Sequence, residues 1–282
     1  MQHLFEENGQ YFTYDGENKI YYEKHGTGST NMLCIHGFAS NHRNWYSILP
    51  YILSGDLTVY LIDLKGGGKS STPKDGKYAM KDQAAIITSF IVSLKINNPI
   101  IMGHSMGGGI GLCMAIKENA FQINKLILID TASYKDVTPL FVKILTRRPW
   151  KTIIPRLIIP TRLTVKIAMD RIFYDKNKVT PEIINHYLPY FYKPAYYHPL
   201  VKTAEQLLPE DYNEMLEAIK QIDIPTLIIW AQQDPVLPVE FAERLNKDIR
   251  NSKLMIIDKC GHVPQEEKPG ITAKSIIEFI EN

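Results

Sequence analysis

Residues 99–108 read PIIMGHSMGG, and this stretch decides the fold of the chain. An apolar run that is typical of a buried strand leads into GHSMG at 103–107, which fits the pattern G-x-S-x-G. Small residues are frequent in 108–116, as in a helix that packs closely against a sheet. A serine in this strand–turn–helix context is presented at a helix N-terminus, where the dipole favours developing negative charge. The stretch predicts that Ser105 is a nucleophile, although a simple packing turn would share part of the pattern.

Short apolar runs rich in branched residues flank this stretch and are typical of strands that are buried on both faces, hence parallel. They are 31–35, 57–62, 99–102, 125–129, 226–230 and 253–257, after a hairpin signal at 10–13 and 20–23. Helical spacing of apolar residues fills several intervals, at 78–95, 107–118 and 239–246. The alternation predicts an α/β fold with a mostly parallel, doubly wound sheet.

The interval between the runs at 125–129 and 226–230 is much longer than the others and is rich in Pro, Tyr, Ile and basic residues. It predicts a helical cap inserted between the sixth and seventh core strands. We expect a core domain at 1–130 and 223–282 and a cap domain at 131–222. Basic residues lie among large apolar ones in its first half, as on a surface that contacts lipid. We favour the simpler interpretation, in which the apolar side packs on the sheet edge and the basic side is solvated.

A serine nucleophile needs a base, and an acid that orients the base. His262 follows the last apolar run, from where it can reach the carboxyl edge of the sheet. Asp234 follows the run at 226–230, which gives the chain order serine, acid, histidine. Asp130 ends the preceding run and is a rival for the acid, but either aspartate could instead cap a helix or form a turn. We predict Ser105, Asp234 and His262 as a catalytic triad.

An oxyanion hole requires two backbone N–H groups that point to one place. We expect them from Met106, which follows the nucleophile, and from Phe38, in the loop after the run at 31–35. His36 is then expected to brace this loop, and His104 to be a packed neighbour. A metal site made from His36, His104 and His262 has no supporting ligand spacing, so neither a metal nor a cofactor is expected.

The composition limits the remaining possibilities. The formal net charge is +2 and 45% of the residues are hydrophobic, so no strong field points to a nucleic-acid partner. The three cysteines lie far apart and fit reduced thiols better than a disulfide framework. The first residues lack the pattern of a signal peptide, and the apolar runs are too short for a membrane span, so we expect a cytoplasmic protein.

Taken together, the motifs resemble the α/β-hydrolase superfamily, in its capped esterase or carbon–carbon hydrolase-like branch. They are HGF at 36–38, DLKGGGKS at 63–70, GHSMGG at 103–108, the Asp234 segment and GHVPQEEKP at 261–269. The resemblance covers the chain from about residue 31 to its end, except the cap, and implies an α/β-hydrolase fold. Lys65 replaces the arginine of the family's D-x-R-G-x-G-x-S loop, which is structural. The serine at 105 differs from the aspartate that epoxide hydrolases and haloalkane dehalogenases have there.

The resemblance implies a small-molecule substrate but does not name it, because this fold hosts many reactions. Ring-fission carbon–carbon hydrolases usually resemble H-G-x-G-P-G at the oxyanion loop and have Trp after the histidine. Here Phe38-Ala39-Ser40 and Val263 differ, so we favour an ester of a small apolar acyl or aryl substrate. Carbon–carbon hydrolysis and a slow receptor-hydrolase are the alternatives. Large aromatic residues of the cap are predicted to line the pocket, namely Trp150, Tyr187, Tyr190 and Tyr196.

Overall fold

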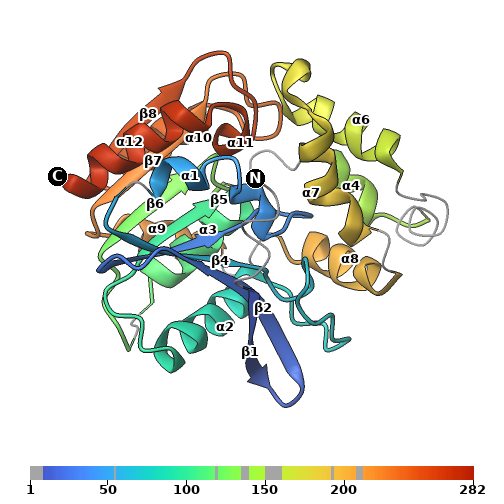
Figure 1. The fold of residues 1–282 in the computed structure, drawn as a ribbon, viewed down its shortest axis with the longest axis horizontal. Coiled ribbons are helices and arrows are strands. Elements are labelled where there is room, and N and C mark those ends of the chain that lie inside the picture. Colours follow the sequence, from blue (N-terminus) through green and yellow to red (C-terminus); the bar gives the residue numbers. More distant parts are fainter. Residues whose placement is uncertain are drawn as a thin grey trace.

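The computed structural model describes residues 9–53, 55–117, 120–134, 140–149, 161–191, 194–207 and 212–282. Within these residues one sheet has the strand order β1-β2-β4-β3-β5-β6-β7-β8 (Figure 1). The strands are β1 Gly9–Asp15, β2 Asn18–His25, β3 Thr30–Ile35, β4 Leu57–Ile62, β5 Ile100–His104, β6 Lys125–Ile129, β7 Thr226–Ala231 and β8 Ser252–Ile257. β2 is antiparallel to β1 and to β4, and the pairs from β4 to β8 are parallel. The mostly parallel sheet expected from the sequence is confirmed.

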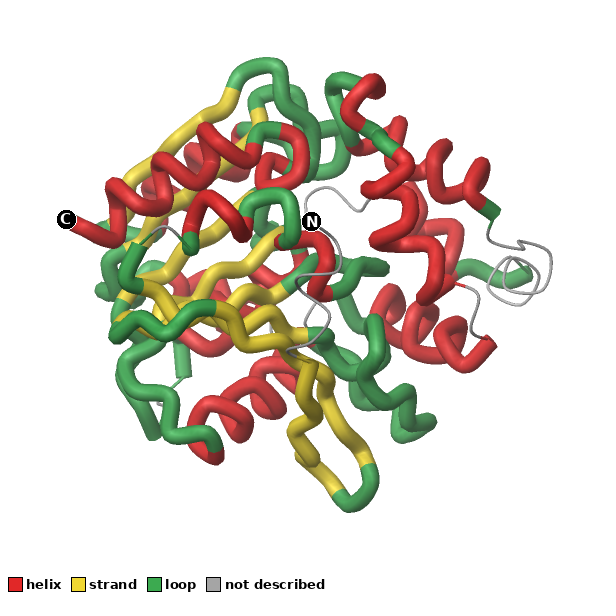
Figure 2. Tube along the Cα trace, in the orientation of Figure 1, coloured by secondary structure: helices red, strands yellow, loops and turns green. Residues whose placement is uncertain are grey.

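Helices cover both faces of the sheet (Figure 2). Those before β7 are the 3-10 helix η3 His42–Trp45, α1 Leu49–Ile52, α2 Met80–Ser93, α3 Met106–Ala115, α4 Leu140–Thr146, α6 Arg162–Ile172, η4 Lys176–Lys178, α7 Pro181–Phe191, η5 Pro194–Tyr196, α8 Tyr197–Glu205 and α9 Tyr212–Ile219. Those after β7 are α10 Glu240–Asp248, α11 Pro264–Glu267 and α12 Pro269–Glu281. Among the described helices, none combines the length and the apolar character that crossing a membrane would require.

The sheet separates two apolar cores, because alternate residues of each buried strand face opposite sides. On one side Leu33 and Ile101 pack with side chains of α2, α3, α9 and α10. On the other side Met32 and Met102 pack with side chains of α1 and α12. Strands covered on both faces are uniformly apolar, which explains why the sequence shows runs rather than alternation.

The helices between β6 and β7 form most of a separate group at one side of the sheet (Figure 1). α6 packs on α7 and α4 packs on α8. A small apolar cluster joins α6, the segment after it and α7 to Val263 of the core. α9 is different, because its residues Tyr212, Met215 and Ile219 belong to the large core beside the sheet. The boundaries of a cap at 131–222 stay a prediction.

A buried polar network links β2 to the loops that follow β3 and β4. The His42 ring lies 3.2 Å from a Glu23 carboxyl oxygen and 2.9 Å from an Asp63 carboxyl oxygen. Burial alone would lower the pKa of His42, but the two carboxylates outweigh it and raise that pKa. Asp63 also accepts the backbone N–H groups of His42 and Lys69, at 2.7 Å each. Asp63 begins the DLKGGGKS loop, and these contacts fit the structural role expected for that loop.

The carboxyl group of Glu266 links three elements that are distant in sequence. It accepts hydrogen bonds from Asn44 of η3 and from the Tyr187 hydroxyl of α7, while Glu266 itself lies in α11. Burial raises the pKa of Glu266 to about 8, although these two hydrogen bonds act in the opposite direction. The contact between α7 and the core therefore includes the Glu266 carboxyl group, whose pKa lies within the pH range in which the protein can be studied.

We predict that Glu266→Gln reduces the pH dependence of stability. The pKa of Glu266 is about 8 in the folded chain against an ordinary value of 4.5, so the folded state retains a proton that the unfolded state loses between these pH values. The free energy of unfolding should therefore fall as pH rises through this window, by up to about 1.4 kcal/mol per pH unit for this group. Urea unfolding between about pH 5 and about pH 8 measures the slope. Glu278→Gln, on the exposed face of α12, is the control; an identical slope in Glu266→Gln and wild type would contradict the prediction.

Candidate active site

Ser105 lies between β5 and α3 with a strained backbone. Its φ is 53° and its ψ is −117°, a backbone conformation that residues other than glycine rarely adopt. Its N–H donates to the Ile129 carbonyl at 2.9 Å, and its own carbonyl accepts from Gly108 and Ala132, both at 3.0 Å. These bonds to the end of β6 and to the first turn of α3 hold the serine in the strained conformation.

The conformation requires α3 to approach the sheet closely, and glycines provide the space. A Cβ at Gly107 would lie 2.0 Å from the carbonyl oxygen of Ile35 in β3. A Cβ at Gly103 would lie 2.3 Å from the carbonyl oxygen of Gly107. A Cβ at Gly108 would lie 2.2 Å from the Thr131 hydroxyl. The glycines in the GHSMGG motif are therefore packing requirements at the elbow.

The structure brings together the three residues that the sequence predicts as a triad. His262 lies in the loop between β8 and α11, and its Nε2 is 3.0 Å from Ser105 Oγ. Its Nδ1 is 2.7 Å from Asp234 Oδ2, and Asp234 lies in the loop after β7. The three side chains come from loops at the carboxyl ends of three parallel strands, β5, β7 and β8.

The surroundings of Asp234 orient the histidine ring. Asp234 Oδ1 accepts the N–H groups of Val236 at 2.7 Å and of Leu237 at 3.0 Å, which leaves Oδ2 for the ring. Because a carboxylate only accepts, Nδ1 of His262 carries the proton and donates. Nε2 is then the acceptor for the Ser105 hydroxyl, which is the tautomer that a general base needs.

Asp130, the rival acid, is fully buried at the end of β6 with a φ of 41°. Its Oδ1 accepts the Ala231 N–H at 2.8 Å. Within the part of the chain that the structure describes, Oδ2 is buried without a hydrogen-bond partner. Burial and the nearby charge of Asp234 raise the pKa of Asp130 well above its ordinary value. Asp130 is therefore the neutral member of two neighbouring carboxyl groups.

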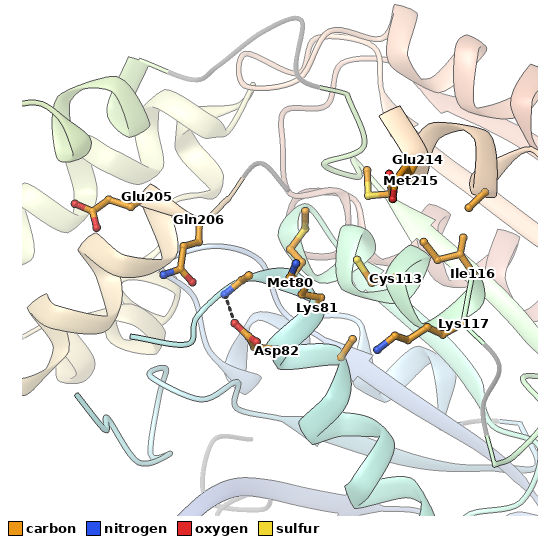
Figure 3. Close-up of a pocket in the computed structure, with 13 residues that line it drawn as sticks. Met80, Lys81, Asp82, Cys113, Ile116, Lys117, Glu205, Gln206, Glu214 and Met215 are labelled. Atoms are coloured by element: carbon orange, nitrogen blue, oxygen red, sulfur yellow. Dashed lines mark hydrogen bonds between the residues drawn. The ribbon is translucent and has the colours of Figure 1, made fainter. Parts of the chain in front are cut away.

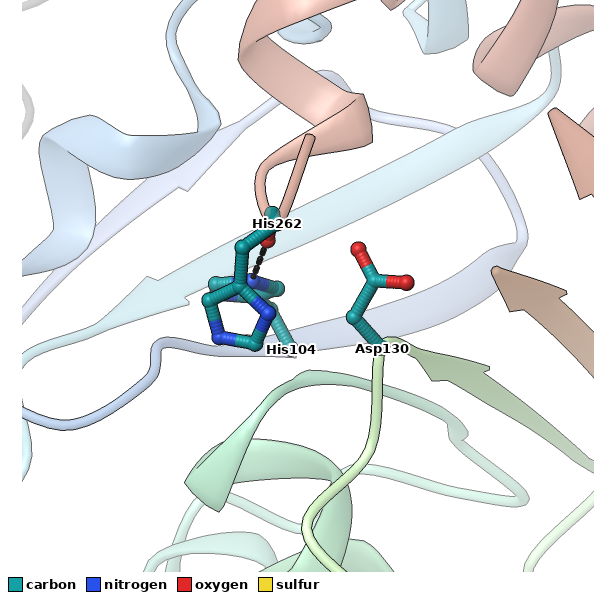
Figure 4. Close-up of side chains that lie close together, drawn as sticks. All are labelled: His104, Asp130 and His262. Atoms are coloured by element: carbon teal, nitrogen blue, oxygen red, sulfur yellow. Dashed lines mark hydrogen bonds between the residues drawn. The ribbon is translucent and has the colours of Figure 1, made fainter. Parts of the chain in front are cut away.

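Ligand atoms of His104, Asp130 and His262 lie within 4.8 Å of one another (Figure 4). Nε2 of His104 donates to the His262 carbonyl at 2.6 Å. Burial and the neighbouring His262 lower the pKa of His104 well below its usual range, so this ring is neutral. Both ring nitrogens of His262 already face Ser105 and Asp234. A cation on these three residues would have to break those contacts, so the set is a poor fit for a metal.

The loop after β3 is held by His36. Its Nε2 accepts the Leu64 N–H at 3.1 Å, so the ring proton is on Nδ1, which donates to the Gly37 carbonyl at 2.8 Å. Burial lowers the pKa of His36 although Asp63 is nearby. Both nitrogens of this neutral ring are occupied by backbone groups, which leaves none for proton transfer.

Three predicted site residues surround one small space beside this loop. A cavity of about 20 Å³ is lined by Phe38, by Met106 at the start of α3 and by Tyr196 of η5. The first N–H groups of a helix have no partner within it, so the Met106 N–H is not used by α3 itself. Tyr196 donates a long hydrogen bond of 3.4 Å to the Ser40 carbonyl, which places it near the loop after β3.

The other predicted pocket residues are placed differently. Tyr187 is buried and its hydroxyl donates to Glu266, so its polar end faces α11. Trp150 and the side chain of Tyr190 lie outside the described residues. A pocket role for all three stays a prediction.

A groove of about 470 Å³, which the sequence did not suggest, lies between α2, α3, α8 and α9 (Figure 3). Met80, Cys113 and Met215 are among the apolar side chains that line it. Its polar lining has both signs of charge, including Lys81 and Glu214. None of the three triad residues lines it, so the groove is separate from the candidate active site.

Residues 30–269 match the family described as alpha/beta hydrolase fold. The chain belongs to this family. The expected resemblance and fold are therefore confirmed, and the hydrolase class follows from the family.

Similar proteins include hydrolases with different named activities. Lipase 3 of Moraxella sp. (strain TA144) is 25% identical over 94% of this α/β-hydrolase and 81% of that protein. The 2-hydroxy-6-oxononadienedioate/2-hydroxy-6-oxononatrienedioate hydrolase of Cupriavidus pinatubonensis is 23% identical, over 95% of this chain and 92% of that protein. The solved structure of the esterase EaEST from Exiguobacterium antarcticum superposes with a TM-score of 0.78 at 25% identity, covering 94% of this chain and 96% of that chain.

Sequence reasoning about this α/β-hydrolase missed the surroundings of the histidine loop. The motif GHVPQEEKP contains Glu267 but does not indicate a role for it. In the structure its side chain bonds to the backbone beside His262, at Gly261. The same carboxyl group bonds to the segment after α6. The only signal in the sequence is the position of a glutamate shortly after the predicted base.

We predict that Gly107→Ala destabilises this α/β-hydrolase by about 3 kcal/mol, because its Cβ would meet backbone that cannot move freely. Gly111→Ala is the matched control in the same helix. There the nearest atom, in the Leu126 side chain, is 3.3 Å from the new Cβ, and alanine favours the helix. Urea unfolding of both variants measures the difference. Equal stability of the two variants would show that α3 is not confined at Gly107.

Proposed function

We propose that this α/β-hydrolase cleaves a carboxylic ester of a small apolar acyl or aryl substrate through an acyl-enzyme on Ser105. The observation that carries the proposal is the chain of contacts from Ser105 through His262 to Asp234. A neutral serine becomes a competent nucleophile only when a base can take its proton, and this arrangement supplies one. Ser105 also lies at the N-terminus of α3, where the helix dipole favours negative charge.

In the first half-reaction, the Ser105 hydroxyl gives its proton to Nε2 of His262 while Oγ attacks the ester carbonyl carbon. The carbonyl oxygen becomes an oxyanion, which accepts hydrogen bonds from the N–H groups of Phe38 and Met106. The charge of Asp234 stabilises the imidazolium that has formed. His262 then gives the proton to the alcohol oxygen, the carbon–oxygen bond breaks, and the alcohol leaves an acyl-serine.

In the second half-reaction, a water molecule replaces the alcohol. It gives one proton to Nε2 of His262 and attacks the acyl carbon, which forms a second oxyanion in the same place. Collapse of this intermediate returns the proton to Ser105 Oγ and releases the carboxylic acid. The sum is one ester and one water consumed, with one acid and one alcohol formed.

The preference for an apolar substrate rests on the cap and on the oxyanion side of the site. Tyr196 of η5 is buried beside Phe38, so an aromatic surface lies close to the place where the acyl group would be held. The names of Lipase 3 and EaEST indicate ester cleavage in similar proteins. We infer a small-molecule substrate with an apolar acyl or aryl part, under a cap formed by helices of 131–222.

Carbon–carbon hydrolysis of a diketone-type substrate is the second candidate, because a relative of similar identity is named as a ring-fission hydrolase. The same serine, base and oxyanion donors would serve that reaction. The chain has Val263 after the histidine and Phe38-Ala39-Ser40 at the oxyanion loop, and these differences favour the ester. Parallel assays with short p-nitrophenyl esters and a vinylogous diketone separate the two activities.

We predict that Ser105→Ala lowers kcat for its best p-nitrophenyl ester by about 10⁴-fold or more, since only the oxyanion donors and binding remain. A fluorophosphonate probe should label the wild type and leave Ser105→Ala unlabelled. Ser89→Ala, whose hydroxyl donates to the Ala85 carbonyl within α2, is the control and should be labelled normally. An ester series of increasing acyl length then tests the apolar preference. Wild-type turnover in purified Ser105→Ala would refute the nucleophile, and a strong preference for charged acyl groups would refute the pocket.

We also predict that Asp234→Asn lowers kcat by about 10⁴-fold, because the amide can hold the wrong tautomer of His262. Asp130→Asn should lower kcat by less than about tenfold, because a raised pKa already keeps that carboxyl neutral and an amide oxygen can still accept the Ala231 N–H. Steady-state kinetics of the two nearly isosteric variants gives the ranking. The reverse ranking would assign the acid to Asp130.

A further inference from the structure

The carboxyl group of Glu267 is buried and accepts backbone hydrogen bonds from two distant segments. One oxygen accepts the Gly261 N–H at 2.8 Å and the Tyr174 N–H at 3.1 Å. The other oxygen accepts the Asp175 N–H at 2.7 Å. Glu267 is only 1% exposed, so these bonds replace its contacts with water. One side chain therefore joins the histidine loop to the segment that follows α6.

The same two segments also contact each other directly. The N–H of His262 donates to the carbonyl of Ile172, the last residue of α6, at 2.8 Å. A Cβ at Gly261 would lie 2.1 Å from that same carbonyl oxygen, so the two backbones are as close as a glycine permits. The predicted base thus donates its backbone N–H to the carbonyl at the end of a cap helix.

Side-chain contacts reinforce this backbone contact between the histidine loop and the end of α6. Val263, next to the base, is buried in the cluster formed by α6, α7 and the segment between them, with Phe173 among its members. Lys178 of η4 donates through Nζ to the Glu267 carbonyl at 2.6 Å. The loop that presents the base is therefore fixed to residues 172–178 of the cap by apolar, backbone and side-chain contacts.

The core fixes the rest of His262. Its carbonyl accepts from Nε2 of His104, and its ring bonds to Asp234 and Ser105. The carbonyl of His262 is thus bonded to the core, and its N–H is bonded to the cap. If the end of α6 and the segment after it move away, the N–H of His262 loses its acceptor and the ring loses part of its orientation. Displacements of about 1 Å at reacting groups can lower a rate by about 10²-fold.

We propose that Glu267 is a positioning residue that makes the base of the active site depend on the docked position of the cap segment 172–175. The proposal rests on the proposed function, since it assumes that His262 is the base. It implies that the cap cannot open on the α6 side without disabling catalysis. Glutamine cannot replace Glu267, because its amide nitrogen would face an N–H donor instead of accepting from it.

The test compares Glu267→Gln with the wild type in kinetics and in hydrogen exchange. At a temperature where both proteins are folded, kcat per fluorophosphonate-titrated site should fall by about 10²-fold, with KM changed by less than about threefold. Hydrogen exchange should rise together in peptides covering 172–178 and 260–268, because one carboxyl group holds both. Glu278→Gln, the same chemical change on the exposed face of α12, should match the wild type in both measurements.

Gly261→Ala provides a second, independent disruption, since its Cβ would push the Ile172 carbonyl away from the histidine loop. It should reproduce the same kinetic and exchange changes, and combining it with Glu267→Gln should add little, because both break one contact. The wild type alone also gives a test that survives if both variants fail to fold. Its amides of Tyr174, Asp175, Gly261 and His262 should exchange in one cooperative opening.

Each outcome decides the proposal separately from the proposed function. If exchange rises in only one of the two peptides, or if Tyr174 and Asp175 open far faster than His262 in the wild type, Glu267 does not couple the segments. If exchange rises in both peptides while kcat stays at the wild-type value, the contact is structural only and the positioning role is refuted. If the wild type neither reacts with the probe nor cleaves any ester, the proposed function and the positioning role both fail. The exchange results then still show whether Glu267 joins the two segments.

Discussion

The close contact between α3 and strand β3 fixes the geometry at the carboxyl ends of the parallel strands, where the candidate active site lies. With only hydrogen at Gly107, the backbone of α3 lies against the Ile35 carbonyl, and any side chain there would overlap it. The chain can then leave β5 and enter α3 only through a sharp turn, which places Ser105 at a positive φ. Gly37 is confined in the same way, because a Cβ there would lie 3.1 Å from the Ser105 Cβ, so the loop after β3 packs closely against the elbow. Small residues at the elbow thus set the distance between Ser105 and its surroundings.

Two adjacent glutamates, Glu266 and Glu267, show how the core and the cap are joined. Both are buried, which is unfavourable for carboxyl groups unless hydrogen bonds replace water. Glu266 is bonded to side chains of η3 and α7, while Glu267 is bonded to backbone N–H groups on both sides of the boundary. Because consecutive residues point in different directions, α11 contacts two parts of the cap at once. The short helix after His262 in this way connects the core to the cap through polar contacts.

The two aspartates near His262 differ in their environments more than in their positions. Asp234 accepts two backbone N–H groups on one oxygen and faces the imidazole with the other. Asp130 accepts a single backbone N–H and is enclosed, so burial and the charge of its neighbour raise its pKa. Two charged carboxylates this close would repel each other, which is one cause of the raised pKa of Asp130. The environments of two buried histidines are also set by backbone groups. Both nitrogens of His36 are bonded to the backbone, and Nε2 of His104 donates to a backbone carbonyl.

The order of the strands, the elbow at Ser105 and the chain order of the predicted serine, acid and histidine could all be predicted from the sequence. These are local patterns: apolar runs report burial on both faces of a sheet, and the glycines around Ser105 report close packing within a few residues. The tertiary structure decided what depends on contacts between distant segments. It placed the Asp234 carboxylate against the His262 ring and the Asp130 carboxyl against the Ala231 N–H, and it turned the polar end of Tyr187 toward α11. It also joined Glu267 to Tyr174, a contact between segments 93 residues apart, which no local pattern can encode.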